Sequence, residues 1–357
     1  MKVKLKDIFD LQMGKTPSRN NSEYWNGDYK WISIKDISNA NKYIYDTKEK
    51  ITAKAIEDSK IKSIPANTVI MSFKLSIGKT SITKEKIYTN EAIMAFIDKK
   101  TLPIDINYIY YLLSNWNWNI ITNKAVMGLT LNKSILSNLE IDLPSIDEQK
   151  KIANILDKVT NLIELRKKQL EKLDIFSKAL FVEMFGDPIL NTKNFPFTKL
   201  INIIKFQRGY DLPIQNRIKG DIPVYGANGI LGYHSEYKFK NGIITGRSGS
   251  IGNVYYCERD FWPLNTTLFS IDMYDNNPRY LCYLLEKFSF KRFINGTGVP
   301  TLNRNVIHKE KIIDVPVELQ NQFAKKVEHI DKIKLSIQDS LTKLETLKKS
   351  LMQEYFS

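Results

Sequence analysis

The sequence predicts an α+β fold: two similar, strand-rich mixed α/β domains separated by two long antiparallel coiled-coil helices, with a pseudo-twofold internal repeat. Three observations predict it. Short motifs recur along the 357 residues at a nearly constant offset. Two stretches rich in glycine, proline and aromatic residues alternate with two stretches that contain no proline. Both proline-free stretches carry apolar residues at heptad spacing, which is typical of coiled coils.

The repeat is seen in five pairs of motifs, and such self-similarity indicates duplication of one ancestral unit. The offset is 171 or 172 in the C-terminal part of each copy and drifts in the N-terminal part. The pairs are ALFVEMF and SLMQEYF, TLNKSI and TLNRNV, YIYYLLS and YLCYLLE, SIGKTSI and SIGNVYY, and LQMGKTP and FQRGYDL.

Two copies of Gly-Lys-Thr, at 14–16 and 78–80, resemble the end of a phosphate-binding P-loop. The motif needs another glycine five residues before its Gly-Lys pair, and Phe9 and Phe73 stand there. The second copy of the repeat keeps Ser-Ile-Gly but not Lys-Thr. We therefore predict a tight turn between strands at Ser-Ile-Gly and no nucleotide site.

The glycine- and proline-rich stretches and the proline-free stretches divide the chain into four predicted segments. Short β-branched and aromatic runs broken by turn residues predict strand-rich modules at 1–146 and 186–316, the first and second modules. Each module ends with an expected helix, at 107–122 and 278–294. The proline-free segments 147–185 and 317–357 predict a central and a C-terminal spacer helix, and 39 residues of helix span about 60 Å.

Heptads identify the seam between the two long helices. A seven-residue spacing holds throughout the second helix and is interrupted by Arg166 in the first. Two such helices on one chain pack most simply antiparallel. The seam residues are Phe323, Ile330, Ile337, Leu344 and Leu351 in the second helix, and Ile152, Val159, Leu173 and Leu180 in the first, flanked by Ile155, Leu162 and Phe176.

The charge is concentrated in the modules. The chain has 53 Lys+Arg against 39 Asp+Glu, a net charge of +14. Residues 1–146 (21 basic, 15 acidic) and 186–316 (17 basic, 11 acidic) each carry +6, whereas each helical segment carries +1. If the lysines served only to keep the surface soluble, the excess positive charge would be distributed evenly along the chain. Its concentration in the modules favours two polyanion-binding modules on a nearly neutral spacer. Two similar modules on a rigid spacer suit duplex DNA read at two separated half-sites.

Several other classes are disfavoured. The N-terminus lacks the apolar run of a signal peptide, no apolar run is long enough to span a membrane, and the two cysteines indicate reduced thiols, so we expect a cytoplasmic protein. The glycine-rich cofactor loop and the (N/D)PP(Y/F) element of DNA methyltransferases do not occur. The three histidines are scattered and predict surface or structural roles. We therefore expect no catalysis by this chain itself and no metal site.

Over almost its full length the chain resembles the specificity subunit of type I restriction–modification systems. The resemblance rests on several sequence motifs that occur in the same order in both halves of the chain. They are IDLPSIDEQKKIANILDKV with VPVELQNQFAKKVEHI, GLTLNKSIL with GVPTLNRNVI, KWISIKDIS and SFKLSIGKTS in the first module, and PVYGANGILGY and TGRSGSIGN in the second. One departure is LQNQF at the start of the second helix, where the first has DEQKK.

The resemblance implies two target-recognition domains, each reading half of an asymmetric bipartite DNA target. It implies helices that dock two methyltransferase subunits, with restriction (motor) subunits joining the larger assembly. S-adenosylmethionine, ATP and magnesium would belong to those partners and not to this chain. The alternative is a basic coiled-coil scaffold that assembles proteins on DNA without reading its sequence.

Candidate contact residues are polar or basic side chains in glycine-punctuated loops, where backbone can approach a groove. Asparagine followed by a basic residue recurs in both copies, which favours helix capping or phosphate contact. The DNA-binding candidates are Arg19, Lys35, Lys74, Lys79, Asn132 and Lys133 in the first module, and Arg208, Arg217, Asn228, Arg247, Asn303 and Arg304 in the second. The partner-binding candidates, on the flank of the first helix, are Glu148, Gln149, Lys150 and Lys151.

Overall fold

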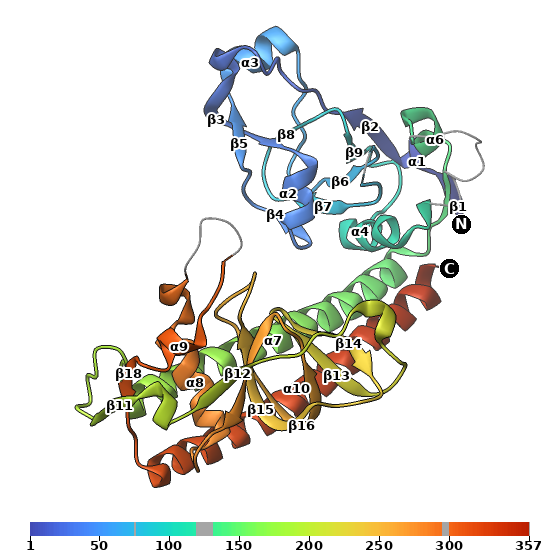
Figure 1. Ribbon diagram of the computed structural model, residues 1–357. Helices are drawn as coiled ribbons and strands as arrows, with labels where there is room; N and C mark the ends of the chain where they lie inside the picture. The colour runs from blue at the N-terminus through green and yellow to red at the C-terminus, as the bar shows by residue number, and fades with distance from the viewer. Residues whose placement is uncertain (75, 119–130, 295–299, 357) are drawn as a thin grey trace. The chain divides into compact units, whose positions relative to one another are not determined.

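The computed structural model describes residues 1–74, 76–118, 131–294 and 300–356 (Figure 1). The chain divides into two compact units. The first unit holds Met1–Leu165 and the chain from Leu341 onward, and the second holds Arg166–Ser340. Each long helix therefore contributes one part to each unit.

The first unit is built on a five-stranded sheet with the order β2-β9-β6-β7-β4. Neighbouring strands are antiparallel except β4, which runs parallel to β7. A three-stranded sheet, β5-β3-β8, and a pair, β1-β10, complete the unit. The strands are β1 Lys2–Lys4, β2 Phe9–Met13, β3 Trp25–Ile32, β4 Tyr43–Ile44, β5 Glu49–Ile51, β6 Val69–Ser72, β7 Thr80–Thr83, β8 Tyr88–Thr89, β9 Ile93–Asp98 and β10 Glu140–Asp142.

Apart from α4 and the parts of the two long helices, the described helices of the first unit have no more than seven residues. α4 begins at the N-cap Asp105, whose side chain accepts from the N–H groups of Asn107 and Tyr108. The expected helix over 107–122 is confirmed as far as Asn115, where α4 ends; it is wrong at Trp116 and Asn117, and residues 119–122 lie outside the described residues. Among the described residues the helices are α1 Leu5–Ile8, η1 Ser22–Tyr24, α2 Ile34–Asn39, α3 Ala53–Ser59, α4 Ile106–Asn115, α6 Lys133–Ser137, the first half of α7 Ile146–Phe185 and the C-terminal part of α10 Val317–Phe356.

The second unit has a six-stranded sheet with the order β12-β17-β15-β16-β13-β14. β13 runs parallel to β16, and a separate antiparallel pair joins β11 and β18. The strands are β11 Phe197–Lys199, β12 Lys205–Arg208, β13 Ile222–Gly226, β14 Gly229–His234, β15 Phe239–Gly246, β16 Val254–Pro263, β17 Thr267–Asp272 and β18 Lys311–Ile313. The helices are η2 Leu200–Asn202, η3 Ile214–Asn216, α8 Pro278–Phe288, η4 Phe290–Phe293, α9 Arg304–Ile307 and the first half of α10 Val317–Phe356.

The two units share a common core, which confirms the predicted internal repeat. The strand order β2-β9-β6-β7 of the first unit equals β12-β17-β15-β16 of the second. β9 and β17 begin 174 residues apart, and α7 and α10, each of 40 residues, begin 171 residues apart. The three-stranded sheet β5-β3-β8 also has its counterpart in β14, β13 and the end of β16, because β3 pairs in parallel with Tyr88 and Thr89 as β13 does with Trp262 and Pro263. The units differ chiefly in the segment that follows β3 or β13, which is longer in the first unit, where it holds α2, β4, β5 and α3 before β6. This difference accounts for the drift of the offset in the N-terminal part of each copy.

Two pairs of glycines occupy equivalent positions in the two units. Gly78 and Gly252 both have positive φ, at 86° and 108°, in the turns that join β6 to β7 and β15 to β16. This confirms the tight turn predicted at Ser-Ile-Gly. A Cβ on Gly14 or Gly209 would lie 2.1 or 2.2 Å from a facing backbone oxygen, so only glycine fits at the end of β2 and β12.

The long helices pack antiparallel within each unit, where the core of that unit covers them. In the second unit Phe181 and Phe185 of α7 pack against Phe323 and Val327 of α10. In the first unit Ile152 and Leu156 of α7 lie in the core against which Leu351 and Met352 of α10 pack, and Asn115 of α4 donates to the carbonyl of Met352. The fold class predicted from the heptads is confirmed.

Two of the predicted flanking residues are not at the seam. Leu162 and Phe176 are 44% and 55% exposed, so the expectation that they pack beside the heptad residues is wrong. The buried residues nearest them are Ile163 and Ser177, one position further along the helix. A small rotational offset of α7 explains the difference, because 3.6 residues per turn does not match a strict heptad.

Candidate nucleic-acid interface

Three arginines of the second unit converge on one groove, the second groove. Arg208 ends β12, Arg247 follows β15 directly, and Arg304 begins α9. The groove has a volume of about 350 Å³. It is lined by Arg208, Arg247, Leu268, Thr301, Leu302, Asn303, Arg304 and Asn305.

The backbone around the second groove is held on both sides. The Arg247 N–H donates to the carbonyl of Thr266 at 2.8 Å, and the Arg247 carbonyl accepts from the N–H of Leu302 at 2.8 Å. Leu302 is buried in the core of the unit and fixes the segment that leads into α9. Hydrogen bonds therefore hold the backbone of Arg247 on both sides.

The charges in the second groove are not neutralised locally. Among the described residues Arg208 and Arg304 have no acidic partner, and Arg247 donates only one long bond, 3.4 Å, to the carbonyl of Asn265. His308 lies nearby and is buried, and its Nε2 accepts from the N–H of Phe206 at 2.9 Å. Burial lowers the pKa of His308, and the positive charges of Arg304 and Lys205 lower it further. The ring is neutral at pH 7, and the groove stays positive because of its arginines.

The first unit has a larger groove, the first groove, of about 760 Å³. It lies along the whole of β2 and against α6. Six lysines line it together with a single acidic residue, Asp10. These lysines are Lys6, Lys15, Lys60, Lys62, Lys99 and Lys133.

Half of these lysines have local partners. Lys6 donates to the side chain of Asn138 at 2.9 Å, Lys15 donates to the carbonyl of Ser59 at 2.7 Å, and Lys99 pairs with Asp10 at 3.6 Å. Lys60, Lys62 and Lys133 have no acceptor for their amino groups among the described residues. The first groove therefore keeps an excess of positive charge that can attract a polyanion.

The two grooves overlap at two equivalent positions, Met13 with Arg208 and Lys133 with Arg304, and otherwise differ in lining. Lys133 and Arg304 both follow the asparagine that caps the short helix, at an offset of 171. Arg208 corresponds to Met13, because both precede the equivalent glycine. Arg247 corresponds to Phe73, which is buried in the core of the first unit.

Five of the twelve DNA-binding candidates line these grooves: Lys133, Arg208, Arg247, Asn303 and Arg304. The side chain of Asn303 accepts from the N–H of Asn305, and that of Asn132 accepts from the N–H of Ile135. Both asparagines cap helices, which confirms the capping that the repeated pattern favoured.

The other candidates lie elsewhere in their units. Arg19 is paired with Glu49, and its guanidinium lies 3.9 Å from the ring centre of Trp25. Arg217 donates to the carbonyl of Leu231 at 3.1 Å, against β14. Asn228, in the turn between β13 and β14, and Lys35, on α2, are exposed.

The remaining two candidates flank the Ser-Ile-Gly turn of the first unit. Lys74 is half-buried, and its amino group lies 5.5 Å from the ring centre of Phe73. Lys79 is exposed just before β7. Neither lines the first or the second groove, and their contacts with DNA stay predictions.

Sequence reasoning missed five lysines of the first groove. They come from α1, the segment after β2, the end of α3 and the end of β9, which are far apart along the chain. No local motif connects these segments. The pairing of β2 with β9 brings Lys99 to the groove, and hydrogen bonds from Gln12 and Lys15 to the carbonyls of Ser59, Lys62 and Ser63 bring the segment after α3.

A buried glutamine joins each module to its long helix, and this corrects one prediction. Gln149 is 1% exposed, so the expectation that it lies free for another protein is wrong. Its Oε1 accepts from the N–H of Asp105, the N-cap of α4, at 2.9 Å, and its Nε2 donates to the carbonyls of Pro103 and Pro144. Glu148, half-buried, forms an ion pair of 3.8 Å with Lys151, and Lys150 is exposed.

The second unit repeats this joint. Gln320 is also 1% exposed, its Oε1 accepts from the N–H of Asn277, the N-cap of α8, at 2.9 Å, and its Nε2 donates to the carbonyl of Val315 at 2.8 Å. Gln320 lies 171 residues after Gln149. The glutamine in DEQKK therefore has its counterpart in LQNQF, although the residues around it differ.

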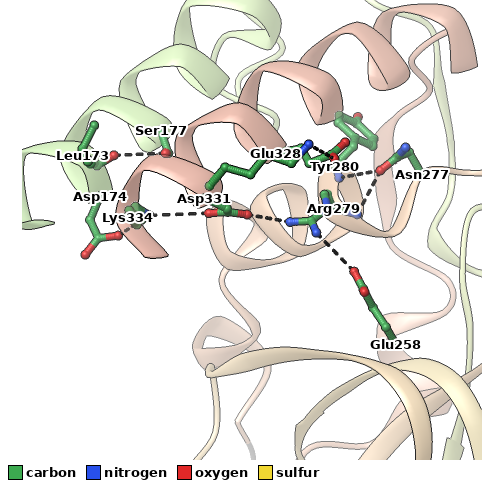
Figure 2. Close-up of polar contacts among 11 residues, drawn as sticks. Leu173, Asp174, Ser177, Glu258, Asn277, Arg279, Tyr280, Glu328, Asp331 and Lys334 are labelled. Carbon is green, nitrogen blue, oxygen red and sulfur yellow. Dashed lines mark hydrogen bonds and ion pairs between the residues drawn. The ribbon is translucent and has the colours of Figure 1, made fainter. Parts of the chain in front are cut away.

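Ion pairs add a second joint in the second unit, drawn in Figure 2. Arg279 of α8 bonds to Asp331 of α10 at 2.6 Å and to Glu258 of β16 at 3.2 Å. Lys334 of α10 bonds to Asp331 at 3.9 Å and to Asp174 of α7 at 2.5 Å. Such pairs are individually weak when exposed, but as a network they fix the orientation of α8 on both long helices.

Each long helix also exposes apolar side chains that the core does not cover. They lie on α7 at Leu162, Leu165, Ile175, Phe176 and Val182, and on α10 at Ile333, Leu335 and Leu347. Within the described residues no cluster of metal-ligating side chains occurs, and no helix is both long and apolar enough to cross a membrane.

The comparisons of this sequence with a family profile and with known proteins agree on one family. The sequence profile of the type I restriction modification DNA specificity domain matches residues 1–174 and 193–348. The type I restriction enzyme MjaIX specificity subunit of Methanocaldococcus jannaschii is 27% identical, over 98% of this chain and 90% of its own length. The EcoprrI specificity subunit of Escherichia coli is 24% identical, over 97% and 90%.

The fold is also found among solved structures. The type I restriction–modification S subunit from M. genitalium superposes with a TM-score of 0.63, at 18% identity, over 100% of this chain and 96% of that one. A chain from a structure of the type I restriction–modification system, determined to explain complex assembly and conformational transition, gives a TM-score of 0.65 at 13% identity, over 100% and 97%.

Proposed function

Because this chain belongs to the type I restriction modification DNA specificity family, we propose that it is the subunit that reads an asymmetric, bipartite target in duplex DNA. Each module reads one part of the target. The chain brings modification and restriction subunits to that target and performs no catalysis itself.

One observation carries the proposal: the two units share a scaffold, but their positive grooves overlap at only two equivalent positions and have different linings. The first groove has six lysines, and the second has three arginines with asparagines beside them. Arginine and asparagine can form paired hydrogen bonds to base edges, whereas lysine acts more as a point charge on phosphate. Two modules with different linings read different sequences, so the target is asymmetric.

The long helices supply the surface for protein partners. Their exposed apolar side chains, such as Phe176 and Leu335, lie on helices whose net charge is close to zero. Apolar surface of this kind is typical of protein interfaces. We assign it to two modification (methyltransferase) subunits, with restriction (motor) subunits joining the assembly. S-adenosylmethionine, ATP and magnesium are used by those partners.

A scaffold that binds DNA without reading it is the alternative. It would need positive charge on the modules but no particular lining of the grooves. It therefore gives no reason why Arg208 and Arg247 should stand where the first module has Met13 and Phe73. The proposal gives that reason, because each module must recognise its own bases.

Selection from randomised duplex DNA tests the proposal. The chain is co-expressed with the modification subunit of its system, and the purified complex is used to enrich duplexes. We expect an asymmetric motif of two parts with a gap of fixed length. The chain alone and the modification subunit alone serve as controls, and salt-sensitive binding with no enriched motif from the complex would favour the scaffold instead.

A further inference from the structure

We propose a division of labour among the groove cations. Arg208 and Arg247 read guanine in the half-site of the second module, whereas Arg304 and its counterpart Lys133 hold backbone phosphates in both half-sites. The inference rests on the proposed function and names the residues through which the second module becomes specific.

The first step concerns the cation that both modules keep. Lys133 and Arg304 occupy the same place, directly after a helix-capping asparagine, and both side chains are exposed. Modules that read different bases share only one ligand, the phosphate backbone. A cation retained at the same place in both therefore contacts phosphate, which fixes the register of the module on the duplex.

The second step concerns the cations that only the second module has. Arg208 and Arg247 stand where the first module has Met13 and Phe73. Phe73 is 1% exposed, so at this position the first module has a side chain buried in its core and no residue that could contact DNA. A contact present in one module alone is free to differ between half-sites, as base reading requires.

The third step is the chemistry of the guanidinium group. Arginine presents a planar fork of donors that matches the O6 and N7 acceptors of guanine in the major groove. Among the described residues Arg208 has no acceptor, and Arg247 has only the long bond to Asn265. Both side chains thus have donors available, and the hydrogen bonds around Arg247 hold its backbone in place before DNA binds.

Asn303 already uses its side chain to cap α9. Its side-chain oxygen already accepts from the N–H of Asn305 at 2.9 Å. An adenine edge needs that oxygen as an acceptor in a paired contact. We therefore expect the base contacts of Arg208 and Arg247 to select guanine in the second half-site.

The test compares four alanine variants in the complex with the modification subunit. Dissociation constants are measured on the selected target, on the target with each guanine of the second half-site replaced in turn, and on an unrelated duplex, at several salt concentrations. Arg259→Ala is the matched control, because Arg259 is an exposed arginine of β16 outside the groove. Circular dichroism verifies that each variant is folded.

For R208A and R247A we expect a loss of about 5- to 150-fold on the selected target and almost none on the unrelated duplex. Replacing the guanine that the arginine reads should remove the difference between variant and wild type. For R304A and K133A we expect a similar loss on every duplex and a salt slope that is smaller by about 1.

Two results would overturn the division of labour. One is an equal loss on all duplexes for R208A and R247A, which would place them on phosphates. The other is a loss for R304A that vanishes when one base is changed. A wild-type complex with no preferred sequence would instead refute the proposed function, so the two failures are distinguishable.

Discussion

Replacing Phe323 with alanine is expected to lower the free energy of unfolding by about 3–5 kcal/mol. Phe323 is fully buried where α7, α8 and α10 meet. Its ring packs edge-on against Phe181, Phe185 and Tyr283, at centroid distances of 5.6, 5.4 and 5.2 Å. Truncation loses these contacts and leaves a cavity that three rigid rings cannot fill. Urea unfolding followed by far-ultraviolet circular dichroism measures the change.

Phe176→Ala is the matched control for this prediction. Phe176 lies on α7 and is 55% exposed, so its truncation should change the free energy of unfolding by less than about 1 kcal/mol. Similar destabilisation by both variants would contradict the packing of the long helices described here.

Replacing Gln320 with leucine is expected to cost about 2–3 kcal/mol of unfolding free energy. Leucine is similar in size but cannot accept from the N–H of Asn277 or donate to the carbonyl of Val315. These groups would be left without partners at a buried joint, where water cannot replace the lost bonds. Hydrogen exchange should become faster at the start of α8, because the joint fixes its N-cap.

Two further variants make this prediction specific. Gln322→Leu, on the exposed face of α10 two residues away, should leave both unfolding and exchange unchanged. Gln149→Leu should reproduce the effect in the first unit, at the start of α4, because Gln149 accepts from the N–H of Asp105 in the same way. Wild-type exchange at α8 in the Gln320 variant would contradict the structural role of this glutamine.

The architecture was predictable because its signals are periodic. Heptad spacing and the absence of proline predicted both long helices to within a residue or so, as α7 Ile146–Phe185 and α10 Val317–Phe356. The Ser-Ile-Gly repeat predicted two tight turns, and both contain a glycine with positive φ. Each of these features depends on residues close together in sequence, or on the same residue appearing twice.

The grooves were less predictable because strand pairing creates them. Arg208, Arg247 and Arg304 were chosen as separate candidates, and nothing in the sequence indicated that they share one groove. The lysines of the first groove carry no motif at all, and a surface lysine looks the same in any loop. Only the fold brings such residues together.

The prediction that Gln149 is exposed is wrong for a physical reason, and the internal repeat contains a signal of its burial. It stands among charged residues at a helix start, a pattern typical of solvent-exposed flanks. Its amide is buried because three backbone groups of the preceding segment surround it. The glutamine recurs at Gln320 while its charged neighbours do not, and that contrast is a sequence signal for a structural role.

Affinity as a function of gap length tests most directly the claim that one chain reads two parts of one target. Duplexes carry the two selected parts with the gap lengthened or shortened by one base pair, which shifts one part by about 3.4 Å along the axis and rotates it about the axis. Because both modules are anchored on the same two continuous helices, we expect each change to reduce affinity to that of a duplex with only one part. Equal affinity across several gap lengths would contradict the account.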